Sequence, residues 1–110
     1  MNSVINLIAS ALPCPLYANQ SDDPGECAVY DLYTNTYDGR KRTVRLRVNL
    51  AAATMARALE LEMLLDAALV TLNETPLTDT CTASTRNGGG WVTDGDRHIR
   101  ICYYDLTLRA

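Results

Sequence analysis

The sequence predicts an α+β fold, in which a mostly antiparallel sheet of four to five strands carries a long helix and a short N-terminal helix on one face. Residues 54–73 contain neither Gly nor Pro and are rich in strong helix formers. Residues 43–50 alternate between apolar and polar side chains, as a half-buried strand does. Turn residues separate further strand-like segments on both sides, which favours hairpins flanking a helix.

Two apolar stripes run along the predicted helix at 54–73. A rotation of about 100° per residue puts one stripe on the face that covers the sheet, and its members are Ala58, Leu61, Leu64, Leu65, Ala68 and Leu72. A second stripe lies nearly opposite, with Glu62 and Asp66 beside it, and consists of Met55, Leu59, Met63 and Val70. A helix on one small sheet needs only one apolar stripe. We expect a subunit contact to cover the second; the alternative is that the N-terminal helix packs on it.

The N-terminal half follows from shorter patterns. Val4, Ile8 and Leu12 lie at helical spacing, which predicts a short helix capped by Asn2 or Ser3 and ended by two prolines. Residues 19–25 are predicted to form a polar loop. Residues 27–37 and 43–50 are then predicted to be two strands joined by a reversal at residues 38–39.

The C-terminal half contains two predicted reversals. Residues 77–86 are expected to be extended, residues 87–90 to form a flexible reversal, and residues 94–95 a tight turn. The last strand, at residues 98–109, changes phase, because Ile99, Ile101 and Tyr103 share one parity and Leu106 and Leu108 the other. A bulge near residues 104–105 would return both sets to one face. Alternatively, both faces of this strand are covered.

Charge is segregated along the chain. The net charge of −3 argues against general nucleic-acid binding. Acidic residues precede a basic cluster that consists of Arg40, Lys41, Arg42, Arg45 and Arg47. The two strands of the predicted hairpin could pair through these opposite charges. The other interpretation is a basic patch that meets a partner.

Length and composition indicate a single soluble domain over residues 1–110. No apolar run is long enough for a membrane-spanning helix, and no secretory signal opens the sequence, so we expect the chain in the cytoplasm where it is made. The four cysteines, Cys14, Cys27, Cys81 and Cys102, are widely spaced and are expected to be free thiols.

No combination of residues predicts catalysis, a cofactor or a metal site. The Gly-rich segment lacks the Lys-Ser/Thr pair and following helix that a phosphate loop needs. His98 and Cys102 are four residues apart on a strand, about 13 Å, so they cannot form a nucleophile–base pair. Glu60 and Glu62 point away from each other on a helix. Binding or assembly is the favoured class of function.

Several segments together carry a family resemblance. They are Ala28-Val-Tyr-Asp-Leu-Tyr-Thr, Thr43-Val-Arg-Leu-Arg-Val-Asn-Leu, a long helix opening with Ala-Ala-Thr-Met-Ala, and Ile99-Arg-Ile-Cys-Tyr-Tyr-Asp-Leu-Thr. Over residues 26–109 the chain resembles the minor tail proteins of long-tailed phages, and more narrowly the tail terminator and tail completion proteins. These are small α+β proteins that close the tail tube as a ring, commonly a hexamer, and present a surface to the head connector.

The resemblance implies a non-enzymatic virion protein of a phage or prophage, found in the virion tail and in the host bacterial cytoplasm during assembly. The implied partners are further copies of the chain, the tail tube protein and the head connector protein, without membrane or sequence-specific nucleic acid. The candidate contact residues are Met55, Leu59, Met63, Val70, Arg45 and Arg47. Other interpretations are a head–tail connector or neck protein, and a small cytoplasmic binding domain that caps a ligand with the Gly-rich loop and Trp91.

Overall fold

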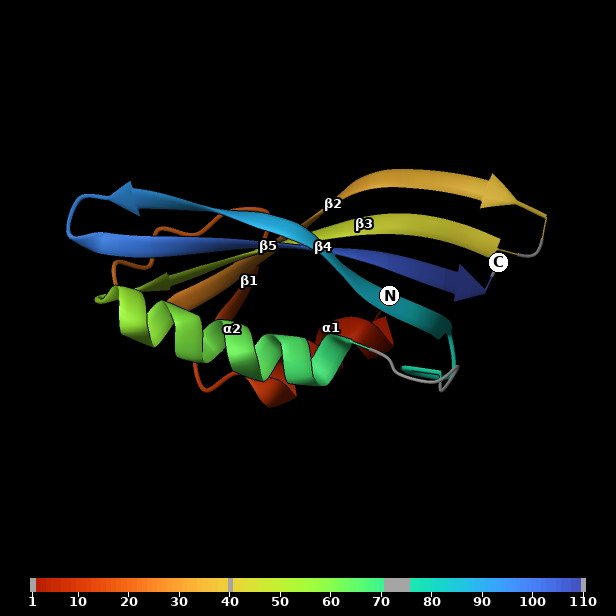
Figure 1. Ribbon diagram of the computed structural model, residues 1–110, viewed down its shortest axis with the longest axis horizontal. Helices are drawn as coiled ribbons and strands as arrows, with labels where there is room; N and C mark the ends of the chain where they lie inside the picture. Colours follow the sequence, from red (N-terminus) through yellow and green to blue (C-terminus); the bar gives the residue numbers. More distant parts are fainter. Residues whose placement is uncertain (1, 40, 71–75, 110) are drawn as a thin grey trace.

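The computed structural model of the protein describes residues 2–39, 41–70 and 76–109. The chain forms a five-stranded sheet with two helices packed on one of its faces (Figure 1). The elements are α1 (Asn2–Ala11), β1 (Leu16–Ala18), β2 (Cys27–Asp38), β3 (Lys41–Ala52), α2 (Met55–Leu69), β4 (Cys81–Asp94) and β5 (Arg97–Arg109). The strands lie in the order β1-β2-β3-β5-β4, and every pair is antiparallel except β1 with β2. The predicted α+β class is confirmed, and the short parallel strand β1 was not predicted.

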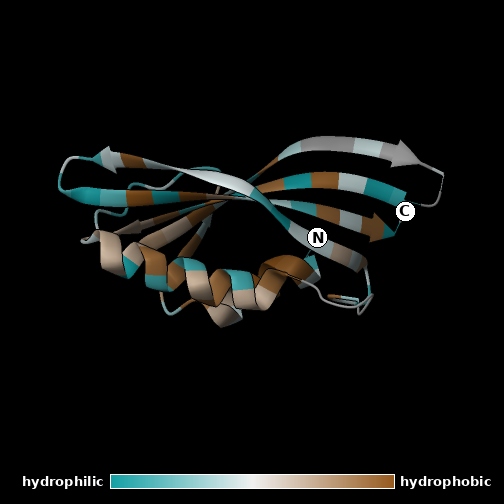
Figure 2. Cartoon of the chain, viewed as in Figure 1, coloured by the Kyte–Doolittle hydropathy of each residue, from teal (hydrophilic) through white to brown (hydrophobic). Residues whose placement is uncertain are grey.

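β3 lies at the centre of the sheet, between β2 and β5. Its alternation of apolar and polar residues (Figure 2) places the even-numbered side chains from Val44 to Ala52 in the core. The prediction of a strand at 43–50 is therefore confirmed. The polar side chains at the odd-numbered positions of β3 face the other side of the sheet, which no helix covers. We call this side the open face.

β5 pairs with β3 from His98 to Arg109 without any register shift. Of the two alternatives for the phase change, the bulge near residues 104–105 is therefore absent. Cys102, Tyr104, Leu106 and Leu108 all point to the helices because they share one parity. Ile99, Ile101 and Tyr103 point to the open face and are half-buried within the sheet itself. The phase change marks which apolar residues face the helices and which face outward.

α2 begins where predicted, with the Thr54 hydroxyl accepting a hydrogen bond from the Arg57 backbone N–H at 3.1 Å. It ends earlier than predicted, at Leu69, because Val70 is already extended. Its buried residues are Ala58, Leu61, Leu65 and Leu69. Leu64 was predicted to face the sheet but is 42% exposed, because the buried stripe is rotated toward Leu69. Leu72 lies outside the described residues.

α1 lies beside α2 on the same face of the sheet, as predicted (Figure 1). Val4, Ile8 and Leu12 are buried against the core, and Pro13 follows directly after them. The Ser3 hydroxyl donates to the Thr78 hydroxyl at 3.1 Å, which ties the start of α1 to the segment before β4.

The predicted reversal at residues 87–90 is wrong, because these residues lie inside β4. The strand continues through them with a register shift between Arg86 and Gly89. A side chain at position 89 would place Cβ 2.4 Å from the Ile101 carbonyl oxygen, so this close approach of β4 to β5 requires glycine. The reversal falls instead at the predicted second turn, where Gly95 has a φ of +61° between the paired residues Asp94 and Arg97.

Truncation of Leu65 should show that the buried stripe of α2 supports the fold. Leu65 is fully buried, so Leu65→Ala should lower the free energy of unfolding by about 2–5 kcal/mol. Leu64→Ala, at the next and partly exposed position, should cost less than about 1 kcal/mol. Urea denaturation measures both values. Equal losses at the two positions would contradict the observed orientation of α2.

Candidate functional site

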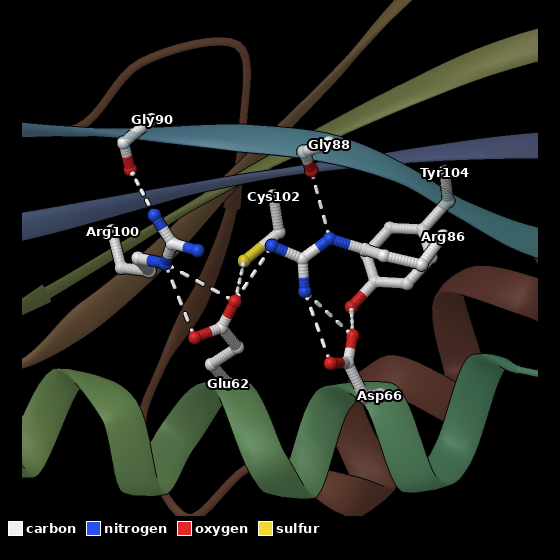
Figure 3. Close-up of polar contacts among 8 residues, drawn as sticks. All are labelled: Glu62, Asp66, Arg86, Gly88, Gly90, Arg100, Cys102 and Tyr104. Carbon is white, nitrogen blue, oxygen red and sulfur yellow. Dashed lines mark hydrogen bonds and ion pairs between the residues drawn. The ribbon is translucent and has the colours of Figure 1, made fainter.

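An ion cluster lies between α2 and the strands β4 and β5 (Figure 3). Glu62 and Asp66 are one helical turn apart, so both project from the same side of α2. Glu62 Oε2 lies 2.6 Å from Arg86 Nη2 and 3.1 Å from Arg100 Nε. Asp66 accepts from Arg86 Nη1 at 2.9 and 3.0 Å. The two carboxylates and two guanidiniums thus form one connected network.

Backbone and tyrosine groups complete this network. Arg86 Nε donates to the Gly88 carbonyl at 2.8 Å, and Arg100 Nη1 donates to the Gly90 carbonyl at 2.9 Å. The Tyr104 hydroxyl donates to Asp66. Cys102 Sγ lies 3.9 Å from Glu62 Oε2. The glycines that the sequence suggested as a loop therefore hold the arginines of the cluster through their carbonyl groups.

Glu62 stays ionised through the neutral pH range. Burial is the strongest single influence on Glu62 and opposes its ionisation, but the hydrogen bonds and charges of Arg100 and Arg86 together outweigh it and lower its pKa. Burial raises the pKa of Cys102 to about 12. Burial, followed by the hydrogen bond to Asp66, raises the pKa of the Tyr104 hydroxyl. These groups fix α2 on the sheet and are not poised for proton transfer.

Three of the predicted contact residues form an exposed row on α2. We call Met55, Leu59 and Met63 the outer stripe; all three are exposed, and Met63 reaches 72%. α1 packs beside α2 and leaves the outer stripe open, which differs from the alternative that α1 covers it. Val70 does not belong to the outer stripe, because it follows the end of the helix and packs partly buried against the core.

The two predicted arginine contacts, Arg45 and Arg47, lie on the open face of the sheet, and each is in an ion pair. Arg47 Nη2 lies 2.5 Å from Asp31 Oδ2, and its guanidinium stands 4.7 Å from the centre of the Tyr33 ring. This pair confirms that opposite charges connect the strands of the β2–β3 hairpin. Arg45 Nε pairs instead with Asp105 on β5, at 3.0 Å. Arg40 lies outside the described residues.

Other polar candidates from the sequence are not brought together. Glu60 pairs with Arg57 at 2.9 Å on the exposed side of α2, whereas Glu62 faces the ion cluster. Trp91 is partly buried against the core, and its ring lies 5.9 Å from that of His98. Within residues 2–39, 41–70 and 76–109, no group of three or more His, Cys, Asp or Glu residues could hold a metal ion.

The ion cluster was not predicted, because its two arginines are distant in sequence from its two carboxylates. Glu62 and Asp66 were placed beside the outer stripe, but Arg86 and Arg100 were not recognised as their partners. The orientation of Arg100 could have been predicted from the sequence. It is two residues from Cys102 on the last strand, so both side chains face the helices. No comparable signal existed for Arg86, since the register shift in β4 decides which way it points.

No helix in the described part of the chain is long and apolar enough to cross a membrane. No protein-family model matches the sequence, and no curated protein matches it either. The fold has a counterpart in a virion. One chain of a solved structure, described as the virion of a native gene transfer agent (GTA) particle, superposes with a TM-score of 0.69. The match covers 97% of this chain and 92% of that chain at 13% sequence identity, so it establishes a shared fold.

Neutralising Glu62 should weaken the attachment of α2 to the sheet. The Glu62 side chain is only 12% exposed, so Glu62→Gln leaves two half-buried guanidiniums short of a carboxylate and should cost about 3 kcal/mol of stability. The control is Glu60→Gln, because that side chain is 61% exposed and its ion pair with Arg57 should contribute less than about 0.5 kcal/mol. Urea unfolding at neutral pH measures both. Equal costs would contradict a supporting role for the cluster.

The stability cost of Glu62→Gln should depend on pH. Because the pKa of Glu62 is lowered in the folded protein, its contribution is fully present above its unfolded pKa of about 4.3. That contribution disappears as pH falls through the lower, folded pKa. The stability difference between wild type and Glu62→Gln should therefore shrink in urea titrations below about pH 4. A difference that stays constant to the lowest pH of folding would contradict the lowered pKa.

Thiol reactivity should follow burial. All four cysteines are free in the structure; Cys27, Cys81 and Cys102 are buried and Cys14 is half-buried. Burial, aided by the charge of Glu26, raises the pKa of Cys14 to about 11, and the thiolate is the reactive form. A thiol reagent at pH 8 should modify Cys14 slowly and the other three only after denaturation. Fewer than four reactive thiols in denaturant would show a disulfide, and modification of Cys102 before Cys14 would contradict the burial.

Proposed function

We propose that this chain is a structural protein of a phage-like virion, and that it caps the end of the tail tube as a ring. In this role it stops tube growth and offers a surface for head joining. The observation that carries the proposal is the fold shared with a chain of a gene transfer agent virion over nearly the whole length of both chains. Two independent features, the outer stripe and the ion cluster, fit an assembly role.

The outer stripe supports assembly because it is a contiguous row of large apolar side chains on a rigid element. Single exposed apolar residues are common on monomeric proteins, but a row of them along one helix is typical of an interaction surface. The ion cluster fixes the helix on the sheet beside this row. A surface held in this way binds a partner without the entropic cost of ordering a mobile segment.

The proposed partners are further copies of the chain in a ring, with a hexamer as the expected size, the tail tube protein and the head connector protein. The protein would reside in the virion tail, after assembly in the cytoplasm of the bacterial host. Its role would be structural, without catalysis, cofactor, membrane or sequence-specific nucleic acid. A head–tail connector or neck protein is the second candidate, because a virion component with this fold could equally sit between tube and head.

Deletion of the gene from the phage or prophage that carries it separates these roles. Loss of a tube-capping protein should give tubes of irregular length that are not joined to heads, because nothing stops their growth. Loss of a neck protein should give tubes of uniform length beside separate heads. Electron microscopy of lysates measures tube length and head attachment, with the gene supplied in trans as the control. Normal virions in the deletion strain would refute both roles.

A further inference from the structure

The outer edge of β4 is an unprotected strand edge at residues 89–94. β4 is the last strand of the sheet, and this segment pairs with β5 on one side only. Among the described residues, no backbone group is hydrogen-bonded to its other side. Natural proteins commonly block such edges with lysine, proline or a bulge. Residues 89–94 contain neither lysine nor proline, and their pairing with β5 is regular.

Every second residue of this edge directs its backbone groups outward. Asp94 and Arg97 face each other across the two-residue turn, so they form the hydrogen-bonded pair that closes it. Hydrogen-bonded pairs alternate along an antiparallel ladder. Gly89, Trp91 and Thr93 therefore turn their N–H and C=O groups away from β5. These groups are available to another strand.

The open face has a gap beside this edge, at Gly90. A side chain there would meet Ile101 Cδ1 at 3.7 Å, which is an ordinary contact, and the φ of Gly90 lies outside the left-handed region. The single chain therefore does not need glycine at this position. Val92, the next residue on the same face of β4, is 45% exposed. The edge thus combines a bare position with an exposed apolar side chain.

The shape of this edge is complementary to itself. When two copies lie antiparallel with Trp91 opposite the partner's Trp91, Gly90 of each copy lies opposite the partner's Val92. A two-fold axis perpendicular to the sheet keeps both open faces on the same side. Each Val92 then fills the gap at the partner's Gly90 and covers the partner's half-buried Ile101. Cross-strand apolar contacts of this kind stabilise sheets.

Hydrogen bonds and charge agree with the same register. Gly89 lies opposite the partner's Thr93, so outward-facing backbone groups meet outward-facing groups along the whole contact. Asp94 is the only charged residue in the segment from Gly88 to Asp94, and it lies opposite the partner's Gly88. No like charges therefore oppose each other across the two-fold axis.

The other free edge of the sheet offers no such match. β1 pairs with β2 only as far as Tyr30, and beyond it the outer edge of β2 has no partner strand in the described structure. The pairing of this part of β2 with β3 shifts between Leu32 and Asn35, and such an irregularity twists an edge away from a new partner. The regular edge of β4 is the better surface for adding a strand.

We propose that two copies of the free protein join through their β4 edges, at residues 89–94, so that the two sheets become one. The inference goes beyond the proposed function and does not rest on it. A ring that caps a tube has two different ends, so its neighbouring subunits are not related by a two-fold axis of this kind. The dimer is therefore a form of the free protein, and its β4 edges separate when a ring is built.

Sedimentation velocity over a range of concentrations tests the dimer. Wild type should pass from monomer to dimer as its concentration rises. Val92→Lys places a charge in the contact and should weaken dimerisation about tenfold or more. Leu32→Lys is the matched control, because Leu32 is 46% exposed on the other free edge and this variant should dimerise like wild type. Thr93→Pro, which removes an outward-facing N–H, replaces Val92→Lys if circular dichroism shows that variant to be unfolded.

Three outcomes of this experiment would overturn the proposal. They are a wild type that stays monomeric at every concentration, a Val92→Lys variant that dimerises like wild type, and a Leu32→Lys variant that loses the dimer. The third outcome would show that the edge of β2 takes part in the contact.

Amide hydrogen exchange locates the contact within β4. At high concentration the amides of Gly89, Trp91 and Thr93 should be protected in wild type, and in Val92→Lys they should exchange fast. The amide of Gly90 should be protected in both proteins, because it is bonded to β5. Fast exchange of the three outward-facing amides in a wild-type dimer would refute the β4 contact.

Discussion

The pairing of Glu62 with Arg86 and Arg100 is the interaction on which the placement of α2 depends. The buried leucines of α2 attract it to the sheet, but apolar contacts are not directional and permit rotation or sliding. The ion cluster removes that freedom, because each carboxylate must meet its guanidinium at hydrogen-bonding distance. Since a buried charge without its partner is costly, a shifted helix is penalised strongly. The direction in which the outer stripe faces follows from this constraint.

The cluster in turn depends on the irregularity of β4. The register shift between Arg86 and Gly89 places Arg86 toward the helices, and the carbonyl groups of Gly88 and Gly90 then hold the two arginines. Gly89 permits the close approach of β4 to β5 at this point. Gly88 and Gly90 therefore bind the arginines of the ion cluster, and Gly89 between them permits the strand pairing.

The patterns of neighbouring residues predicted those elements that depend mainly on local interactions. The alternation at 43–50 identified β3, and the run of strong helix formers without Gly or Pro from residue 54 identified the start of α2. The glycine run misled the prediction, because glycine commonly marks a turn, whereas pairing with β5 keeps residues 87–90 in a strand. The partners of Glu62 could not be predicted, since they are brought close by strand register between residues far apart in sequence. The exposure of Met63 was predictable, because a helix on one sheet buries one stripe only.

The ion cluster holds α2 on the sheet, and α2 presents an exposed apolar row to the outside. The central claim is that these subunits close the tail tube, and the most direct measurement is a cryo-electron microscopy reconstruction of the head–tail junction in the virion. We predict a single ring of this chain at the end of the tube, with the outer stripe of each α2 covered by a neighbouring subunit. A reconstruction that places the chain along the whole tube, in the head, or nowhere in the particle would contradict the claim.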